Sequence, residues 1–335
     1  MKKSKILNGG EKLNNYVNLA FYPTPIHKLN NINKMFPGYE VYIKRDDQTG
    51  LALGGNKVRK LEYLMKDALD KGFNSVVTFG GMQSNHCRQT AAAAAVLGLK
   101  CFLILRGPEP EVSNGNYLLD KLLNAEILWC NSDEKFLDPE KLMSQYDYGN
   151  DKPYLIPMGG SNYLGSFGYA RAMEEFKNQS EVIGDFDYIF FASCSGGTHS
   201  GMAIGKKIFD IETKIIGINI DKVEDNNFSL HNHIVNISNE ALSKIDDEVR
   251  IENHEIILDS NYSEAGYGVI TENEIETIKL IASTEGILLD PIYTSRAFFG
   301  MLDYLKKKKL PENSKILFWH TGGAPSNFYF LNKLV

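Results

Sequence analysis

The sequence lacks the features that mark several large classes of protein. None of its four cysteines belongs to a CxxC pair, so neither a zinc site nor a disulfide framework is expected. No apolar run is long enough to cross a membrane, and no apolar segment follows the first three residues as in a secretory leader. The net charge is −6 with both signs mixed, which argues against nucleic acid as a partner. We therefore expect a cytoplasmic protein with no metal site, no membrane contact and no nucleic-acid partner.

What is present is an alternation of apolar β-branched runs with helical patterns over most of the 335 residues. The clearest unit is a strand at 75–79, an alanine-rich helix at 88–97 and a strand at 101–105, which predicts an α/β fold with a parallel sheet. Further strands are expected at 126–130, 154–158, 187–193, 214–220 and 315–320. Further helices are expected at 116–124, 138–146, 163–178, 199–209, 273–284 and 295–309.

The chain is long enough for two domains, but it has no internal repeat and no long linker. Two lobes would therefore be interleaved in sequence, with 150–162 as the best candidate for a crossover between them. The segment 222–262, rich in asparagine and acidic residues, carries no clear pattern.

Lys57 has an unusual place in the stretch GGNKVRKLEYLMKDAL, residues 54–69. The apolar positions predict a helix, and Lys57 falls inside its apolar stripe while Arg59 falls opposite. Burial and the helix dipole both disfavour a charged lysine at this end of a helix. A neutral lysine near an anion site suggests covalent attachment of pyridoxal phosphate. The ordinary alternative is a lysine whose tip reaches the surface.

Three stretches follow predicted strands, where ligands bind in open α/β sheets. SCSGGTHSG (193–201) leads into a helix and resembles an anion site, although it matches neither a Walker loop nor GxGxxG; a tight turn is the alternative. In GGMQSNH (80–86), Ser84 or Asn85 could serve only as a helix cap. In the stretch 318–327, His320 is better explained as a packed core histidine than as a catalyst.

Taken together, GGNKVRKLEYL, GGMQSNHCRQTAAAAA, SCSGGTHSG, LDPIYTSRA and WHTGG resemble the D-cysteine desulfhydrase and 1-aminocyclopropane-1-carboxylate (ACC) deaminase family. The resemblance runs from about residue 22 to the C-terminus. It implies pyridoxal 5'-phosphate as cofactor and a tryptophan-synthase-β-like fold, fold type II, with two lobes of open, twisted, mostly parallel sheets. The large cofactor domain would comprise 1–55 and 166–335, and the small domain 56–165. Enzymes of this family are usually homodimers.

The resemblance also implies a cofactor site and a substrate site. The cofactor site would consist of Lys57, Asn85, Ser195, Gly196, Gly197, Thr198 and Thr321. The substrate site would consist of Gln83, Ser84, Asn85, His86, Tyr267, Tyr293 and Thr294. The catalytic residues among them would be Lys57, Ser84, Tyr267 and Tyr293.

Each residue type fits the role that the resemblance gives it. Lys57 would hold the cofactor aldehyde and later act as base, and the 195–198 loop would hold the phosphate. Asn85 would bind the cofactor's 3′-oxygen, while Ser84 would face the substrate and relay protons. Thr321 would meet the pyridine nitrogen. Because a hydroxyl cannot keep that nitrogen protonated as a carboxylate would, elimination is favoured over transamination.

The leading hypothesis is a lyase that converts D-cysteine, a small amino acid, to pyruvate, ammonia and hydrogen sulfide. In ACC deaminases a glutamate typically follows the tyrosine of LDPIYTSRA; here that position is Thr294, as in the desulfhydrase branch. ACC deaminase and another β-elimination are the alternatives within the fold. A nucleotide-binding oxidoreductase or a ligand-binding α/β protein is the alternative from another class. The sequence departs from the family pattern at Ser295-Arg296, where Gly-Lys is usual, and NYSEAGYG lacks the usual proline.

Overall fold

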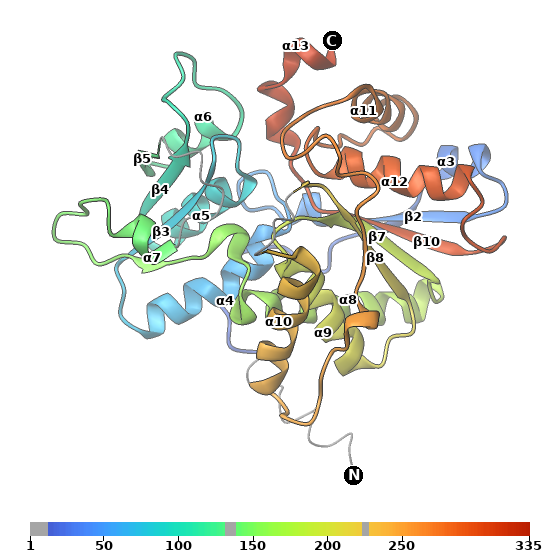
Figure 1. Ribbon diagram of the computed structural model, residues 1–335, viewed down its shortest axis with the longest axis horizontal. Coiled ribbons are helices and arrows are strands. Elements are labelled where there is room, and N and C mark those ends of the chain that lie inside the picture. Colours follow the sequence, from blue (N-terminus) through green and yellow to red (C-terminus); the bar gives the residue numbers. More distant parts are fainter. Residues whose placement is uncertain (1–12, 131–138, 223–227) are drawn as a thin grey trace.

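The computed structural model describes residues 13–130, 139–222 and 228–335, and these form two mostly parallel sheets (Figure 1). The larger sheet has the strand order β1-β2-β10-β7-β8-β9, in which only the β1–β2 pair is antiparallel. The smaller sheet has the order β5-β4-β3-β6 and is parallel throughout. The predicted α/β fold with two open, mostly parallel sheets is confirmed.

The strands of the larger sheet are β1 (Ile26–Lys28), β2 (Glu40–Arg45), β7 (Tyr188–Ser193), β8 (Lys214–Asn219), β9 (Ile257–Asp259) and β10 (Lys315–His320). Those of the smaller sheet are β3 (Ser75–Gly81), β4 (Lys100–Arg106), β5 (Glu126–Cys130) and β6 (Tyr154–Leu155). The α-helices are α3 (Asn30–Met35), α4 (Lys57–Asp70), α5 (Asn85–Leu97), α6 (Gly115–Leu122), α7 (Pro139–Met143), α8 (Tyr163–Ile183), α9 (Gly197–Phe209), α10 (Leu230–Ser243), α11 (Glu272–Glu285), α12 (Thr294–Lys306) and α13 (Leu331–Leu334). In the described ranges no helix is both long and apolar enough to cross a bilayer.

Every strand and helix expected from periodicity is present in the described residues; the strands at 126–130 and 315–320 have the predicted ends, and the other elements have shifted ends. The predicted strand at 154–158 pairs only over Tyr154–Leu155, because Pro157 has no N–H for a sheet ladder. Within the expected helix 138–146, residue 138 lies outside the described residues and α7 covers only 139–143. The sequence patterns did not predict β1, β2 and β9 or the helices α3, α10 and α13.

Helices cover both faces of the larger sheet (Figure 1). On one side lie α3, α11 and α12, and on the other α8, α9 and α10. Between the two sheets lies α4, which packs against α5 and α8, so it is buried nearly all round despite its polar residues. Helix α5 packs against β3 and β4 of the smaller sheet, where its residues Ala91–Ala94 are buried and their small side chains let the helix approach closely.

The strands of the smaller sheet come from one continuous segment, 75–155, whereas those of the larger sheet come from both sides of it in sequence. We propose that the domain boundaries lie at 55/56 and 165/166, as the family resemblance implies. Helix α8 begins just before the second boundary and packs against α4 of the small domain as well as α9 of the large one.

A buried polar network joins α4 to the larger sheet and α8. Asp46, which follows β2, accepts two hydrogen bonds from Arg59, at 2.8 Å from Nε and 2.7 Å from Nη2. It also accepts from the Tyr169 hydroxyl at 2.6 Å and from Trp319 Nε1 at 2.8 Å. Arg59 reaches Glu175 as well, at 3.0 Å. Arg59 therefore lies opposite the apolar stripe of α4, as predicted. It is nevertheless buried, because it packs against the residue after β2 and against α8.

Candidate active site

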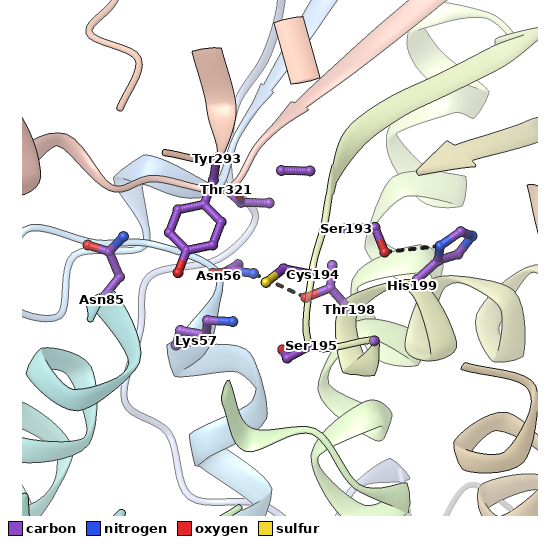
Figure 2. Close-up of a pocket in the computed structure, with 12 residues that line it drawn as sticks. Asn56, Lys57, Asn85, Ser193, Cys194, Ser195, Thr198, His199, Tyr293 and Thr321 are labelled. Carbon is purple, nitrogen blue, oxygen red and sulfur yellow. Dashed lines mark hydrogen bonds between the residues drawn. The ribbon is translucent and has the colours of Figure 1, made fainter. Parts of the chain in front are cut away.

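A pocket lies where the carboxyl ends of parallel strands face the N-termini of helices (Figure 2). It is narrow, with about 430 Å³ of empty space when the open solvent at its mouth is included. The lining residues are Asn56, Lys57, Asn85, Ala192, Ser193, Cys194, Ser195, Gly196, Thr198, His199, Tyr293 and Thr321. Chain segments separated by more than 260 residues thus meet at one cavity.

Lys57 is the first residue of α4, and its side chain ends in the pocket instead of reaching the outer surface (Figure 2). The structure gives its Nζ no hydrogen bond to any described residue. Burial lowers the pKa of the Lys57 amine, while the Cys194 thiol acts weakly in the opposite direction. A lowered pKa makes a lysine a better nucleophile at neutral pH than an ordinary surface lysine, which favours attachment to an aldehyde.

The loop before α9 forms a small polar cradle beside Lys57. Ser195 Oγ lies 2.8 Å from Ser161 Oγ, which also accepts a hydrogen bond from the backbone N–H of Gly197 at 3.2 Å. Opposite, Asn56 Nδ2 donates to Thr198 Oγ1 at 3.1 Å. Hydroxyls and N–H groups at a helix N-terminus suit a phosphate-sized anion. Of the four residues predicted for the phosphate, Ser195, Gly196 and Thr198 line the pocket and Gly197 does not.

Lys60 is a second buried lysine, three residues after Lys57, and sequence reasoning missed it. Its Nζ donates to the backbone carbonyl of Gly159 at 3.0 Å and to Ser161 Oγ at 3.2 Å. Burial, and then the nearby Lys57, lower the pKa of the Lys60 amine well below its usual value. The three-residue spacing places Lys60 and Lys57 on one side of the helix. The partners of Lys60, Gly159 and Ser161, lie in the expected crossover segment, where no sequence pattern indicated a contact with Lys60.

Asn85 reaches the pocket from the N-terminus of α5. Its Oδ1 accepts hydrogen bonds from Arg88 Nη1 and Asn116 Nδ2, both at 2.9 Å. Because the oxygen is occupied, the amide NH₂ is the group that remains for a ligand. Ser84, just before it, is the helix cap: its Oγ accepts from the Cys87 N–H at 3.2 Å. The cap role considered for Ser84 is therefore real.

Gln83 and His86 do not line this cavity. Gln83 Oε1 accepts a hydrogen bond from the Asn116 N–H at 2.8 Å, which ties it to α6. His86 Nε2 lies 2.9 Å from Thr78 Oγ1, and burial lowers the pKa of the imidazole well below its usual value. The proposed contacts of Gln83, Ser84 and His86 with substrate would need a substrate that extends beyond the cavity toward α5.

Tyr293 precedes α12 and projects into the pocket (Figure 2). Its hydroxyl lies 2.8 Å from the Tyr267 hydroxyl, and burial raises the pKa of both phenols. Thr294 behaves differently. Its Oγ1 donates to Asp290 Oδ1 at 2.7 Å and accepts from the Asp290 N–H at 2.7 Å, so the hydroxyl is bound within the turn and does not line the cavity.

Two histidines near the pocket are packed residues. His320 is buried, and its Nδ1 accepts from the Gly322 N–H at 3.2 Å, which leaves the Nε2 proton for the carbonyl of Leu288 at 3.2 Å. This confirms the prediction of a core histidine. His199 lines the pocket but is held near Ser193, with Nδ1 to Oγ 3.3 Å, and burial lowers its pKa to about 3. Both are neutral at physiological pH.

This combination of a two-sheet α/β fold, a buried lysine and a polar cradle defines a class of cofactor-dependent enzymes. The family model "Pyridoxal-phosphate dependent enzyme" matches residues 17–322, and the chain belongs to that family. Its cofactor is pyridoxal 5'-phosphate. Family membership decides against the nucleotide-binding oxidoreductase and the simple ligand-binding protein.

Within that family, the chain is 39% identical to a protein of known structure described as an ACC deaminase homologue. The match covers 98% of each chain with a TM-score of 0.86, which confirms the resemblance stated from the motifs. Threonine deaminase isoform 2 from Solanum lycopersicum is 18% identical with a TM-score of 0.70, over 99% of this chain and 93% of that one. Serine racemase from Dictyostelium discoideum is 18% identical with a TM-score of 0.63, over 96% and 97%. These two show the shared fold type II.

The described residues fit this cofactor. Lys57 provides an amine with a lowered pKa for the aldehyde, and the cradle at 195–198 provides uncharged donors for the phosphate. Directly behind the cradle, the Lys60 amine is hydrogen-bonded to Ser161. Gly159 keeps the space between Lys57 and the cradle open. A Cβ at this residue would lie 2.4 Å from Ser195 Oγ and 3.4 Å from Lys57 Nζ, at a φ of +66°.

Gly159→Ala is therefore expected to weaken cofactor binding by roughly tenfold or more, because Ser195 must move to admit the methyl group. Gly149→Ala is the matched control, since Gly149 has a φ of +62° but a Cβ there would meet nothing within 4 Å. Titration of each cofactor-free variant with pyridoxal phosphate, followed by absorbance, gives the dissociation constants. Equal affinities for the two variants would show that the cradle does not depend on Gly159.

Proposed function

We propose that this enzyme catalyses β-elimination from D-cysteine, giving pyruvate, ammonia and hydrogen sulfide. The observation that carries the proposal is the chemistry of the pocket wall. Among the described residues that line it, none is an aspartate or a glutamate. The position at which ACC deaminases typically have a glutamate is Thr294, whose hydroxyl is bound to Asp290.

The leaving group explains why this matters. Bound pyridoxal phosphate supplies an electron sink that makes Cα–H bonds of amino acids acidic. Opening a cyclopropane then requires an acid or a nucleophile, because its departing group is carbon. D-cysteine loses a thiolate, which leaves without such help. Burial raises the pKa of the Tyr267 and Tyr293 phenols, so neither is a ready proton donor at neutral pH.

The residues of this chain would share the work as follows. Lys57 would first hold the cofactor and then, as a neutral amine, take the proton from Cα of the substrate. Ser195 and Thr198 would orient the cofactor through its phosphate. Asn85 would donate its amide NH₂ to the cofactor's 3′-oxygen. The Tyr267–Tyr293 pair would border the substrate and restrict water.

ACC deaminase is the second candidate, supported by the 39% identity to the protein described as an ACC deaminase homologue. It would require one of the two tyrosines to assist the departing carbon, despite the raised pKa of both phenols. Another β-elimination, with a different leaving group, is compatible with the same pocket. We further propose that the enzyme acts as a homodimer in the cytoplasm, as the family resemblance implies.

The test is a comparison of three substrates with the cofactor-saturated enzyme. We expect pyruvate and sulfide from D-cysteine, with L-cysteine and ACC at least about a hundredfold slower. Lys57→Ala serves as the blank for elimination catalysed by free cofactor. Ammonia release from ACC at a rate comparable to D-cysteine turnover would overturn the proposal and favour the second candidate.

A further inference from the structure

Arg296 occupies the place where the family pattern has lysine, and it is 1% exposed. Its guanidinium makes four hydrogen bonds. Nε donates to Glu274 Oε1 at 2.7 Å, and Nη1 donates to the carbonyls of Ile220 at 2.7 Å and Gly266 at 2.9 Å. Nη2 donates to the carbonyl of Val269 at 2.6 Å. One side chain thus joins α12 to the end of β8, the start of α11 and the segment between β9 and α11.

That last segment, residues 260–271, is named here the Tyr267 loop. Tyr267 stands between Gly266 and Gly268, whose φ angles of +81° and +75° are accessible mainly to glycine. A Cβ at either glycine would meet nothing within 4 Å, so the loop is not packed tightly around them. Within the loop the Gly266 N–H donates to the carbonyl of Ser263 at 2.8 Å, and three further hydrogen bonds near Tyr267 come from outside the loop.

Arg296 supplies two of those bonds, on both sides of Tyr267, at Gly266 and Val269. Asp221 Oδ1 supplies a third by accepting from the Tyr267 N–H at 3.2 Å. Tyr293 is the residue just before α12 and lies three residues before Arg296 in sequence. The N-terminal end of α12 thus holds the backbone of the loop through Arg296 and meets its tyrosine hydroxyl through Tyr293.

We propose that Arg296 is a positioning residue that holds Tyr267 against Tyr293 at the pocket before substrate arrives. A lysine could not do this, because one ammonium cannot reach three carbonyls and a carboxylate as the planar fork of arginine does. The contact of Tyr267 with substrate rests on the proposed function. The control of the loop by Arg296 does not, and the experiment separates the two.

Arg296→Lys is expected to release the loop without removing the charge that faces Glu274. Loss of two or three hydrogen bonds should raise amide hydrogen exchange in peptides covering 260–271 by roughly tenfold or more, in the cofactor-loaded enzyme without substrate. Arg171→Lys is the matched control, an arginine paired with Glu62 that does not contact the loop. Unchanged exchange of the loop in Arg296→Lys would overturn the proposal.

The kinetic consequence is a split between KM and kcat. If Tyr267 borders the substrate, Arg296→Lys should raise KM for D-cysteine by about tenfold while kcat falls much less. Combining Arg296→Lys with Tyr267→Phe should cost less than the sum of the single changes, because both act on one element. Faster loop exchange with unaltered kinetics would leave Arg296 as the loop's anchor and refute the role of Tyr267 in the proposed function.

A second variant removes both charges of the Arg296–Glu274 pair together. In Arg296→Gln with Glu274→Gln no buried charge is left unpaired, which limits the loss of stability. Circular dichroism verifies the fold, and the loop should again exchange faster than in the parent. Loop exchange that stays at the parent's rate in this folded double variant would also contradict the proposal.

Discussion

Lys57→Ala is expected to lower turnover by about a thousandfold or more, since in the proposed function this one residue both attaches the cofactor and takes a substrate proton. The variant should bind pyridoxal phosphate only reversibly. Burial lowers the pKa of the Lys57 amine, and among the described residues its Nζ has no hydrogen-bond partner to compete for it. Lys66→Ala, on an exposed part of the same helix and paired with Asp70, is the matched control and should keep near-parental activity.

Borohydride reduction of the parent enzyme identifies the attachment residue directly. We expect the visible absorbance of the bound cofactor to disappear and the label to remain on the peptide that contains Lys57. Lys60 is the critical competitor, because it is also buried and its pKa is also lowered. Its Nζ, however, is already bound to Gly159 and Ser161. A label on Lys60, or a protein that stays colourless with added pyridoxal phosphate, would refute the assignment.

Asp46→Asn is expected to lower the free energy of unfolding by about 3–5 kcal/mol at pH 7, the usual effect of removing one partner of a buried ion pair. Asp46 is fully buried and accepts from Arg59, Tyr169 and Trp319. Asp47→Asn is the matched control. Asp47 is the neighbouring carboxylate and pairs with Arg45 at a partly exposed site, where about 0–1 kcal/mol is expected.

The effect should depend on pH with a definite sign. Burial alone would raise the pKa of Asp46, but the charge and hydrogen bonds of Arg59 outweigh it and hold the pKa below its usual value. A carboxyl group whose pKa is lower in the folded than in the unfolded state stabilises the protein at pH values above the unfolded pKa of about 3.9. This stabilisation is lost as the pH falls through the folded-state pKa. The difference between parent and Asp46→Asn should therefore be constant from pH 7 to 5 and shrink below about pH 4. Chemical denaturation at equal cofactor saturation measures it, and an Asp46 effect no larger than that of Asp47→Asn would contradict the role of the network.

The placement of strands and helices was largely predictable because it depends on local periodicity. The strands at 75–79 and 101–105 were predicted from apolar runs, and these runs reflect side chains that are buried in the folded protein. The elements that escaped prediction had weak local signals. β1 and β2 mix charged with apolar residues, and α10 lies in the polar segment 222–262.

The sequence by itself determined that Lys57 faces inward, because its position in the apolar stripe of α4 follows from the helical repeat. The order of the sequence motifs also determined the family and the cofactor. Small residues after a strand allow backbone N–H groups to approach a ligand, and this requirement does not depend on how the rest of the chain packs. The positions of Ser195, Thr198 and Thr321 at the pocket followed from those motifs.

Only the tertiary structure decided which side chains meet. Ser161 reaches Lys60 across 101 positions of the chain, and Glu175 meets Arg59 across 116. No local pattern encodes such pairs, because their contact depends on how α4 and α8 pack. For the same reason the sequence could show that Arg296 departs from the family pattern, but only the folded chain shows that its guanidinium binds both sides of Tyr267.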